Sequence, residues 1–400
     1  MKNTVKYTGF RKIVSILFFI SLFILAFTQG PPIVQVCADA EPSEQDLEET
    51  IKEQLGALDL EALQDYIESL ENFNNQSLTE RIIAYVKGAD FDYKSFGKQL
   101  GKTFFNQVEE LMPAFACITA VTLLSGIVST LKSGTIAKTS SEMIFMVTYA
   151  AALIPLIGVL IEVFSLSTGA IGSMQKQMQL IFPLMLTLMS ASGGAISATV
   201  CRPAVAFFST TIVSMMESVV LPLTITTIVF SMTSKLTTEL KIGKFTAFFK
   251  SINKWIIGVC VSVFGIFFTL QGITSVTYDG IVRRAAKYAI GNGVPIVGGF
   301  LSGGFDLAVA GGILIKNSLG SMSIFLMLSV LFEPLTLLIA VNILLRLVSA
   351  ITQPFGDGRI SDFLSETVEN LHYCTAGLLF TAFLYFLTIM VMIFSTEALF

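Results

Sequence analysis

Long uninterrupted apolar runs dominate the pattern of hydrophobic and polar positions along this chain. Several runs reach about 18 residues or more, which as an α-helix is enough to cross a hydrocarbon core of roughly 30 Å. The strands of a membrane β-barrel would instead alternate apolar and polar residues. The pattern therefore predicts an all-α, polytopic membrane protein with about eight transmembrane helices. We place these helices at Leu111–Leu131, Met143–Phe164, Leu180–Val200, Pro203–Phe230, Trp255–Leu270, Val294–Ile315, Met322–Leu345 and Tyr373–Phe394.

A different pattern occupies the N-terminus. Basic residues precede a short apolar run, Ile13–Phe27, and small residues around Ala38-Asp39-Ala40 follow it. This order predicts a cleaved secretory signal peptide over residues 1–40. Val36-Cys37-Ala38 is an alternative cleavage site, and an uncleaved first membrane span is the alternative interpretation of the segment.

Residues 41–108 are acidic and amphipathic. Between Glu41 and Glu80, Lys52 is the only basic residue among many carboxylates. Apolar residues from Leu47 to Leu70 recur at helical spacing. We expect a helical segment outside the cytoplasm, whose acidic face is either merely solvated or a docking surface for a partner. The membrane domain then covers residues 109–400.

Composition supports a membrane protein and gives no indication of an enzyme. The chain is 53% hydrophobic and 14% charged, with a mean hydropathy of +0.75. His372 is the single histidine, and the cysteines lack the C-x-x-C spacing of zinc or redox sites. No Walker motif is present, so a partner must hydrolyse any ATP. We therefore predict no catalytic residue, cofactor, metal site or nucleic-acid partner.

Two tracts in the membrane domain resemble each other. Ser192-Gly193-Gly194 returns as Ser302-Gly303-Gly304, and Pro222-Leu223-Thr224 returns as Pro334-Leu335-Thr336. An amphipathic stretch and a proline precede each Ser-Gly-Gly sequence. We interpret the tracts as repeat units of about 172–270 and 280–394; the alternative is coincidence between two Gly-rich helices. Three predicted helices per unit is an odd number, which predicts an inverted repeat with a functional path between its halves.

Charged and small residues inside the predicted helices are the candidate functional residues. An ionisable side chain at the bilayer centre is costly unless it is shielded. We expect Glu217 and Asp306 to line a path or to be paired in the interior, and these two roles remain open. Arg202 and Lys316 are expected to extend to the membrane surface. The candidate residues for helix packing or for lining a path are Gly193, Gly194, Gly303, Gly304, Glu217, Asp306, Pro222 and Pro334.

Basic residues give conflicting information on topology. The first predicted helix brings Lys132 and Lys138 to the cytoplasmic side if residues 41–108 lie outside. A lysine cluster over 235–254 precedes the fifth helix, and an arginine-rich cluster over 283–287 follows it. One cluster must then lie outside; counting puts the lysine cluster and the C-terminus there.

Four stretches carry a family resemblance: "SASGGAISA", "LQGITSVTYDGIVRRAAKYAIGNGVPIVG", "AGGILIKNSLG" and "ITQPFGDGRISDFL". In them the chain resembles the stage III sporulation protein AE family of endospore-forming Firmicutes. The resemblance implies a multi-pass component of a transenvelope complex in the mother-cell-derived membrane around the forespore. It also implies as partners the other stage III sporulation proteins, including a secretion-type ATPase and ring-forming subunits. Through those subunits it implies indirect contact with the forespore protein stage II sporulation protein Q.

Two functional classes follow. The first is a non-enzymatic membrane subunit of a secretion-like channel needed for endospore development. The second is a self-sufficient small-molecule transporter, which the inverted repeat and the intramembrane acids also favour. The exported acidic segment favours the first class, because a lone transporter has less need of it.

Overall fold

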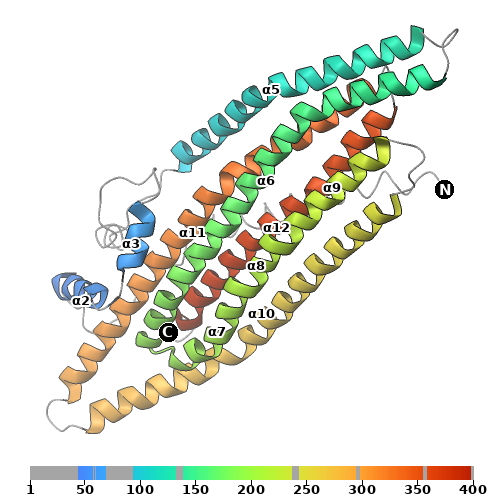
Figure 1. Ribbon diagram of the computed structural model, residues 1–400. Helices are drawn as coiled ribbons and strands as arrows, with labels where there is room; N and C mark the ends of the chain where they lie inside the picture. The colour runs from blue at the N-terminus through green and yellow to red at the C-terminus, as the bar shows by residue number, and fades with distance from the viewer. Residues whose placement is uncertain are drawn as a thin grey trace. The chain divides into compact units, whose positions relative to one another are not determined.

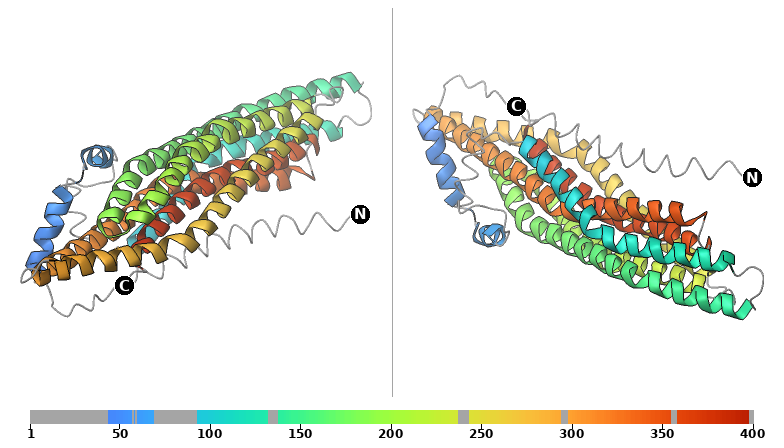
Figure 2. Two further views of the ribbon diagram at one scale, coloured as in Figure 1. Left: turned by 90° about the horizontal axis from the view of Figure 1, so that it is seen from below. Right: turned by 90° about the horizontal axis from the view of Figure 1, so that it is seen from above.

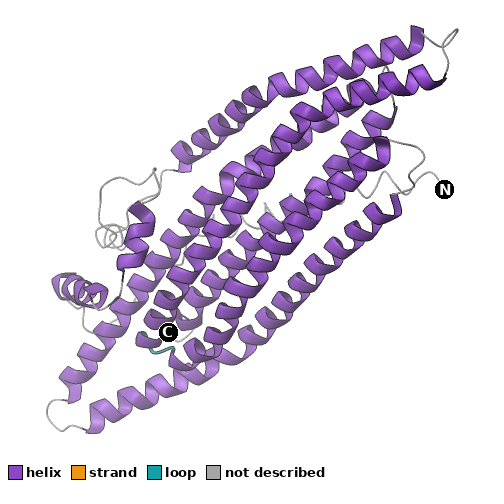
Figure 3. Cartoon of the chain, in the orientation of Figure 1, coloured by secondary structure: helices purple, strands orange, loops and turns teal. Residues whose placement is uncertain are grey.

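The computed structural model describes residues 44–56, 58, 60–68, 93–131, 138–236, 243–293, 298–354 and 358–397. The expected signal peptide, residues 1–40, lies outside these ranges. The described residues from Glu48 onward belong to one compact unit. Every regular element among the described residues is helical (Figure 3), which confirms the all-α fold class.

Short helices precede long ones along the chain. The two short helices are α2 (Glu44–Gly56) and α3 (Glu61–Glu68). The long helices are α5 (Tyr93–Leu131), α6 (Lys138–Ala191), α10 (Gly243–Gly293), α11 (Gly298–Thr352) and α12 (Gly358–Glu397). Between α6 and α10 runs a continuous rod, called here the α7–α9 rod (Figure 1). It consists of α7 (Ala195–Phe207), the π-helical turn η1 (Phe208–Ile212), α8 (Val213–Met215), the π-helical turn η2 (Met216–Val220) and α9 (Leu221–Leu236).

Six helical stretches among the described residues are long and apolar enough to cross a membrane, where the sequence predicted about eight. The described part of the predicted helix 294–315, which begins at Gly298, and the predicted helix 322–345 belong to one helix, α11. The predicted helix 180–200 is divided, because α6 ends at Ala191. Polar stretches such as Ser165–Gln179 end an apolar run, but they contain no proline and continue the helix. Hydropathy therefore predicted helix ends at positions where the backbone remains helical.

Successive long helices run in opposite directions (Figure 1). Along α6, contacts with the α7–α9 rod pair Tyr149 with Met232 and Gly172 with Glu217, so these elements are antiparallel. Contacts with α11 pair Gln177 with Leu326, and residue 192 with residue 312, which is again antiparallel. The rod and α11 therefore run in the same direction. The predicted inverted arrangement of the two tracts is wrong, because a single long helix, α10, lies between the rod and α11 and returns the chain to the same direction.

The lysine-rich start of α10 lies at the same end of the bundle as the start of α6. Lys235 contacts Glu366 at 3.2 Å and Lys250 contacts Glu369 at 3.5 Å, so the α9–α10 connection lies beside the first turns of α12. Arg359, in the first turn of α12, lies 3.4 Å from the centre of the Phe145 ring in α6. The lysine cluster was expected on the side opposite Lys138, and that expectation is wrong.

The helices α11 and α12 form the centre of the bundle, and the two views of Figure 2 show other helices around them. The helix α11 contacts α12, α6, α5 and α10, and α12 also contacts α9, α6 and α10. Large side chains such as Phe182, Phe363 and Tyr385 are fully buried there. The proline-containing segments stay helical: Pro334 lies within α11, and Pro222 directly follows the wide turn η2. A wide turn gives the ring room beside the preceding carbonyls.

Candidate functional site: the helix junction around Lys316

The first Ser-Gly-Gly sequence forms the reversal between α6 and α7. The Gly194 N–H donates to the Met189 carbonyl at 2.9 Å, and the Gly193 N–H donates to the Ser190 carbonyl at 3.2 Å. This pair of bonds is the Schellman arrangement of a helix C-terminus. Gly193 has φ 90°, which is a left-handed conformation that favours glycine. Gly194 then acts as the N-cap of α7.

This turn packs directly on α11. Ser192 is fully buried, and its hydroxyl donates to the Leu188 carbonyl at 2.6 Å. A Cβ atom added to Gly312 would lie 2.7 Å from the Ser192 Oγ, closer than side chains normally approach. The absence of a side chain at Gly312 therefore lets the turn rest against the backbone of α11.

The same face of α11 receives the end of α12. Lys316 is fully buried, and its ammonium donates to the Ile393 carbonyl at 2.6 Å. A Cβ atom added to Gly320 would lie 2.6 Å from the Ile393 Cδ1. Gly312, Lys316 and Gly320 follow at four-residue steps, so they share one face of α11. We call this meeting of the Ser192 turn, α11 and the end of α12 the Lys316 junction.

The position of Lys316 contradicts the expectation that it extends to the membrane surface. The last carbonyls of a helix carry partial negative charge, so an ammonium group near the end of α12 is electrostatically favourable. An interfacial lysine and a buried lysine look the same in an apolar sequence. Only the end of α12, some 77 residues further along the chain, distinguishes them.

The acidic N-terminal segment packs beside this junction. In α2, the Gln54 amide donates to the Ala308 carbonyl of α11 at 2.8 Å. A Cβ atom added to Gly311 would meet the side chains of Gln54 and Thr50 at 3.5 Å. Gly311 therefore faces α2, and Gly312 faces both the Ser192 turn and, at 3.7 Å, the Gln54 side chain of α2.

The helix α3 packs on α6 through a buried tyrosine. Gln177 of α6 donates from its amide to the Tyr66 hydroxyl at 3.1 Å and to the Leu326 carbonyl of α11 at 3.3 Å. Leu63 and Ile67 are buried beside Tyr66. Burial raises the pKa of Tyr66, and hydrogen bonds with Gln177 and Ser173 partly lower it.

Glu217, a candidate from the sequence, lies elsewhere. It belongs to η2, is partly exposed and faces Gly172, whose added Cβ would lie 3.7 Å from the carboxylate. Gly172 and Ser192 are 20 residues apart on α6, which is about 30 Å along the helix. Glu217 is therefore remote from the Ser192 turn.

The other candidates are distributed along the bundle. Pro222 is exposed on α9, and Pro334 is buried in α11. Gly303, Gly304 and Asp306 lie in α11 near its start; their backbone is helical, and their surroundings lie outside the described side chains. The second Ser-Gly-Gly sequence therefore continues a helix where the first forms a turn. Among the candidates whose surroundings are described, Gly193 and Gly194 form the Ser192 turn, whereas Glu217 lies elsewhere along the bundle.

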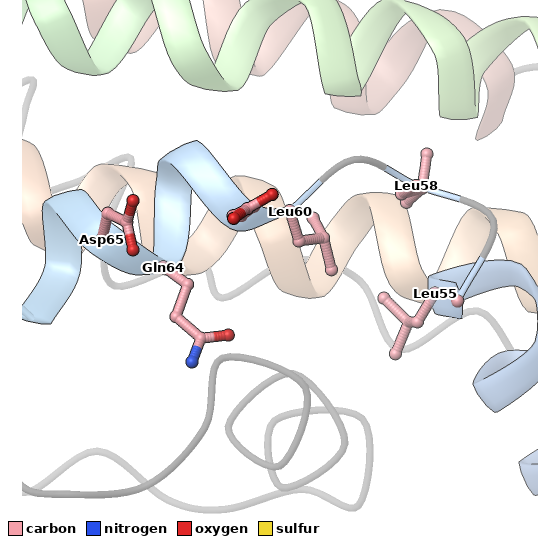
Figure 4. Close-up of a pocket in the computed structure, with 7 residues that line it drawn as sticks. Leu55, Leu58, Leu60, Gln64 and Asp65 are labelled. Atoms are coloured by element: carbon pink, nitrogen blue, oxygen red, sulfur yellow. The ribbon is translucent and has the colours of Figure 1, made fainter.

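The described residues contain no group of three or more metal-ligating side chains. A pocket of about 410 Å³ lies on the α2–α3 pair (Figure 4). Its polar lining consists of Glu61, Gln64 and Asp65, with no histidine, cysteine or basic side chain among the lining residues.

Comparison with known proteins identifies the family. The model of the family described as Stage III sporulation protein AE matches residues 77–396. The chain belongs to the stage III sporulation protein AE family. It is 23% identical over 384 residues to Stage III sporulation protein AE of Bacillus subtilis (strain 168), covering 93% of this chain and 95% of that protein. No solved structure matches the chain.

Membership of the stage III sporulation protein AE family confirms the resemblance and gives the chain a role in sporulation. The match includes the Ser192 turn, the α11 face from Gly311 to Gly320 and the end of α12. The stretch "AGGILIKNSLG" carries the residues of the Lys316 junction. The sequence pointed to this stretch only as a resemblance, because glycine and lysine at four-residue steps do not reveal which helices meet there.

Proposed function

We propose that this chain is a non-enzymatic, multi-pass membrane subunit of the secretion-like channel complex that joins mother cell and forespore. Its location is the mother-cell-derived membrane around the forespore. Its partners are the other stage III sporulation proteins, including a secretion-type ATPase and ring-forming subunits, and indirectly stage II sporulation protein Q. Family membership supports the role in sporulation.

The packing of the N-terminal helices carries the proposal. Ile51 and Leu55 of α2, like Leu63 of α3, are buried. The opposite side carries exposed carboxylates at Glu53, Glu61 and Asp65. The apolar faces of α2 and α3 thus pack within the chain. The acidic face is exposed, and a partner with basic residues can bind there. Charge complementarity of this kind favours fast and specific association.

Charge reversal at that face tests the proposal. We expect the triple substitution Glu53→Lys, Glu61→Lys, Asp65→Lys to abolish co-purification of the other stage III proteins from sporulating cells, and to block sporulation. The protein should still accumulate in the membrane, because the substituted side chains are exposed. The neutral set Glu53→Gln, Glu61→Gln, Asp65→Asn alters the same exposed positions with little change in size and should weaken co-purification less than charge reversal does. Normal sporulation of the triple variant would contradict the proposed docking role.

A self-sufficient small-molecule transporter is the second candidate, and Glu217 favours it. Its partly exposed carboxylate lies within a membrane-candidate stretch, in one of two π-helical turns. Intramembrane acids and π-helical turns both occur frequently at functional sites. Liposomes containing only the purified protein separate the candidates: solute flux that Glu217→Gln abolishes would favour the transporter over the complex subunit.

A further inference from the structure

One exposed stripe runs along the first half of α10. Its members are Lys244, Phe248, Ser251, Trp255, Val259, Ser262 and Ile266. They follow at three- and four-residue steps, so they lie on one side of the helix. Trp255 and Ile266 are 70% and 63% exposed, although both are large and apolar. The opposite side of α10 is buried: Asn253 donates to the Thr224 hydroxyl at 2.7 Å, and Phe264 packs on Phe208.

The character of the exposed residues changes along the helix. The first part, Lys244–Trp255, combines aromatic rings with the ammonium groups of Lys244, Lys250 and Lys254. From Val259 to Ile266 the exposed large side chains are aliphatic. Aromatic and basic residues favour the membrane–water interface, and aliphatic residues favour the hydrocarbon core. Along α10, residues that favour the membrane–water interface are therefore followed by residues that favour the hydrocarbon core. A helix that enters a bilayer passes through these two zones in the same order.

Basic residues lie at both ends of the bundle. The end with the start of α10 holds Lys138, Lys235, Lys244, Lys250, Lys254, Arg346 and Arg359 (Figure 1). The arginine-rich residues 283–287 lie at least about 42 Å beyond Trp255 along α10, which is more than the roughly 30 Å hydrocarbon core, so they lie toward the opposite membrane surface. The basic residues at the start of α10 can therefore meet the headgroups of one leaflet only.

The geometry points to a lipid-anchoring surface on α10: Lys244–Trp255 binds the anionic headgroup zone of one leaflet, and Val259–Ile266 contacts the acyl chains of that leaflet. The partner is the bilayer itself. Trp255 marks the boundary, and the helix enters the core from Gly243 toward Ile266. This assignment is independent of the proposed complex, because it concerns only the membrane.

The single tryptophan of the chain allows a direct test. The purified full chain is reconstituted in vesicles containing phosphatidylglycerol and lipids brominated at a shallow or a deep acyl position. Two variants move the probe along α10, one to Phe245 beside the stripe and one to Ile266 within it: Trp255→Phe with Phe245→Trp, and Trp255→Phe with Ile266→Trp. Phe245 and Ile266 lie about 15 and 16 Å from Trp255 along α10. Depth should increase in the order 245, 255, 266, with Ile266→Trp losing most emission to deep bromines.

Other outcomes overturn the assignment. A reversed order places the core on the wrong side of Trp255, and equal depths indicate a helix lying flat on the membrane. No quenching at any position indicates that a protein, such as a second copy, covers the stripe. Since all three positions are exposed, the variants should fold, and matching circular dichroism spectra check this. If one fails, Phe248→Trp replaces the shallow probe.

The headgroup claim has its own readout. Lys244→Gln with Lys254→Gln should change the depth of Trp255 in phosphatidylglycerol vesicles and leave it unchanged in phosphatidylcholine, because an anionic surface attracts the lysine ammonium groups. An equal change in both lipids contradicts a role in binding anionic headgroups.

Discussion

The atoms nearest to Gly312 and Gly320 of α11 determine how well each position tolerates a larger residue. Gly312 and Gly320 both leave no room for a Cβ atom, but their neighbours differ. At Gly320 the nearest atom is the end of the Ile393 side chain, which can rotate away. At Gly312 it is the Oγ of Ser192, which is buried and hydrogen-bonded to the Leu188 carbonyl. The tolerance of the two sites should therefore differ.

We predict that Gly312→Ala lowers the stability of the purified protein by about 1–3 kcal/mol, the usual cost of overpacking. Ser192→Ala removes the crowded oxygen, so the same Gly312→Ala change should cost less in that background. Thermal unfolding in detergent of the two single variants and the double variant measures this coupling. Gly265→Ala is the control, because nothing lies within 4 Å of its added Cβ. Additive effects of the two substitutions would show that the clash with the Ser192 Oγ does not cause the loss of stability in Gly312→Ala.

At the level of elements, the sequence predicted helices well and their ends poorly. The runs around Leu111–Leu131 and Tyr373–Phe394 lie within α5 and α12. The predicted helix 180–200 includes the one turn that hydropathy cannot detect, because Gly193 and its neighbours are small rather than polar. The second Ser-Gly-Gly sequence has the same letters and continues a helix. Identical triplets therefore do not determine the local conformation; the surrounding helices do.

The turn at Gly193 gives the second prediction of this Discussion. A residue with φ 90° must adopt a conformation that costs most side chains roughly 1–2 kcal/mol, and asparagine less. We expect destabilisation to increase from Gly193→Asn through Gly193→Ala to Gly193→Val in thermal unfolding. Asparagine is larger than alanine, so an order that follows size would indicate crowding and refute a conformational cause. Gly169→Ala in the preceding helix α6, where nothing lies within 4 Å of the added Cβ, is the control.

At the scale of the whole molecule, distant segments converge on α11 and α6. The α2–α3 pair contacts residues more than 100 positions away, as in the Tyr66–Gln177 bond. The sequence could predict the amphipathic character of this segment, because periodicity is local. It could not predict the surface that receives the segment, since Gln177 and Gly311 acquire their roles only when α6 and α11 lie side by side. For the same reason, the sequence could not predict that Lys316 is buried, because its partner lies at the distant end of α12.

The titration of Tyr66 tests whether α3 packs on α6 as described. Burial raises the pKa of Tyr66 above the usual 10.0, so the packed state favours the neutral phenol. The resulting stabilisation is complete below pH 10 and is lost as the pH rises toward the raised pKa. Spin labels at the exposed residues Glu61 and Gln179, with the native cysteines replaced by alanine, should give a narrow distance distribution at pH 8 that broadens at pH 11.

Tyr66→Phe separates this cause from general alkaline damage. Phenylalanine keeps the ring against Leu63 and Ile67 but cannot ionise, and losing the bond with Gln177 should cost only about 1 kcal/mol. The distribution of this variant should therefore stay narrow at pH 11. Ser173→Ala, which keeps the ionisable phenol, should still broaden. Broadening in Tyr66→Phe equal to that of the unsubstituted tyrosine would show that another group controls the detachment of α3 from α6.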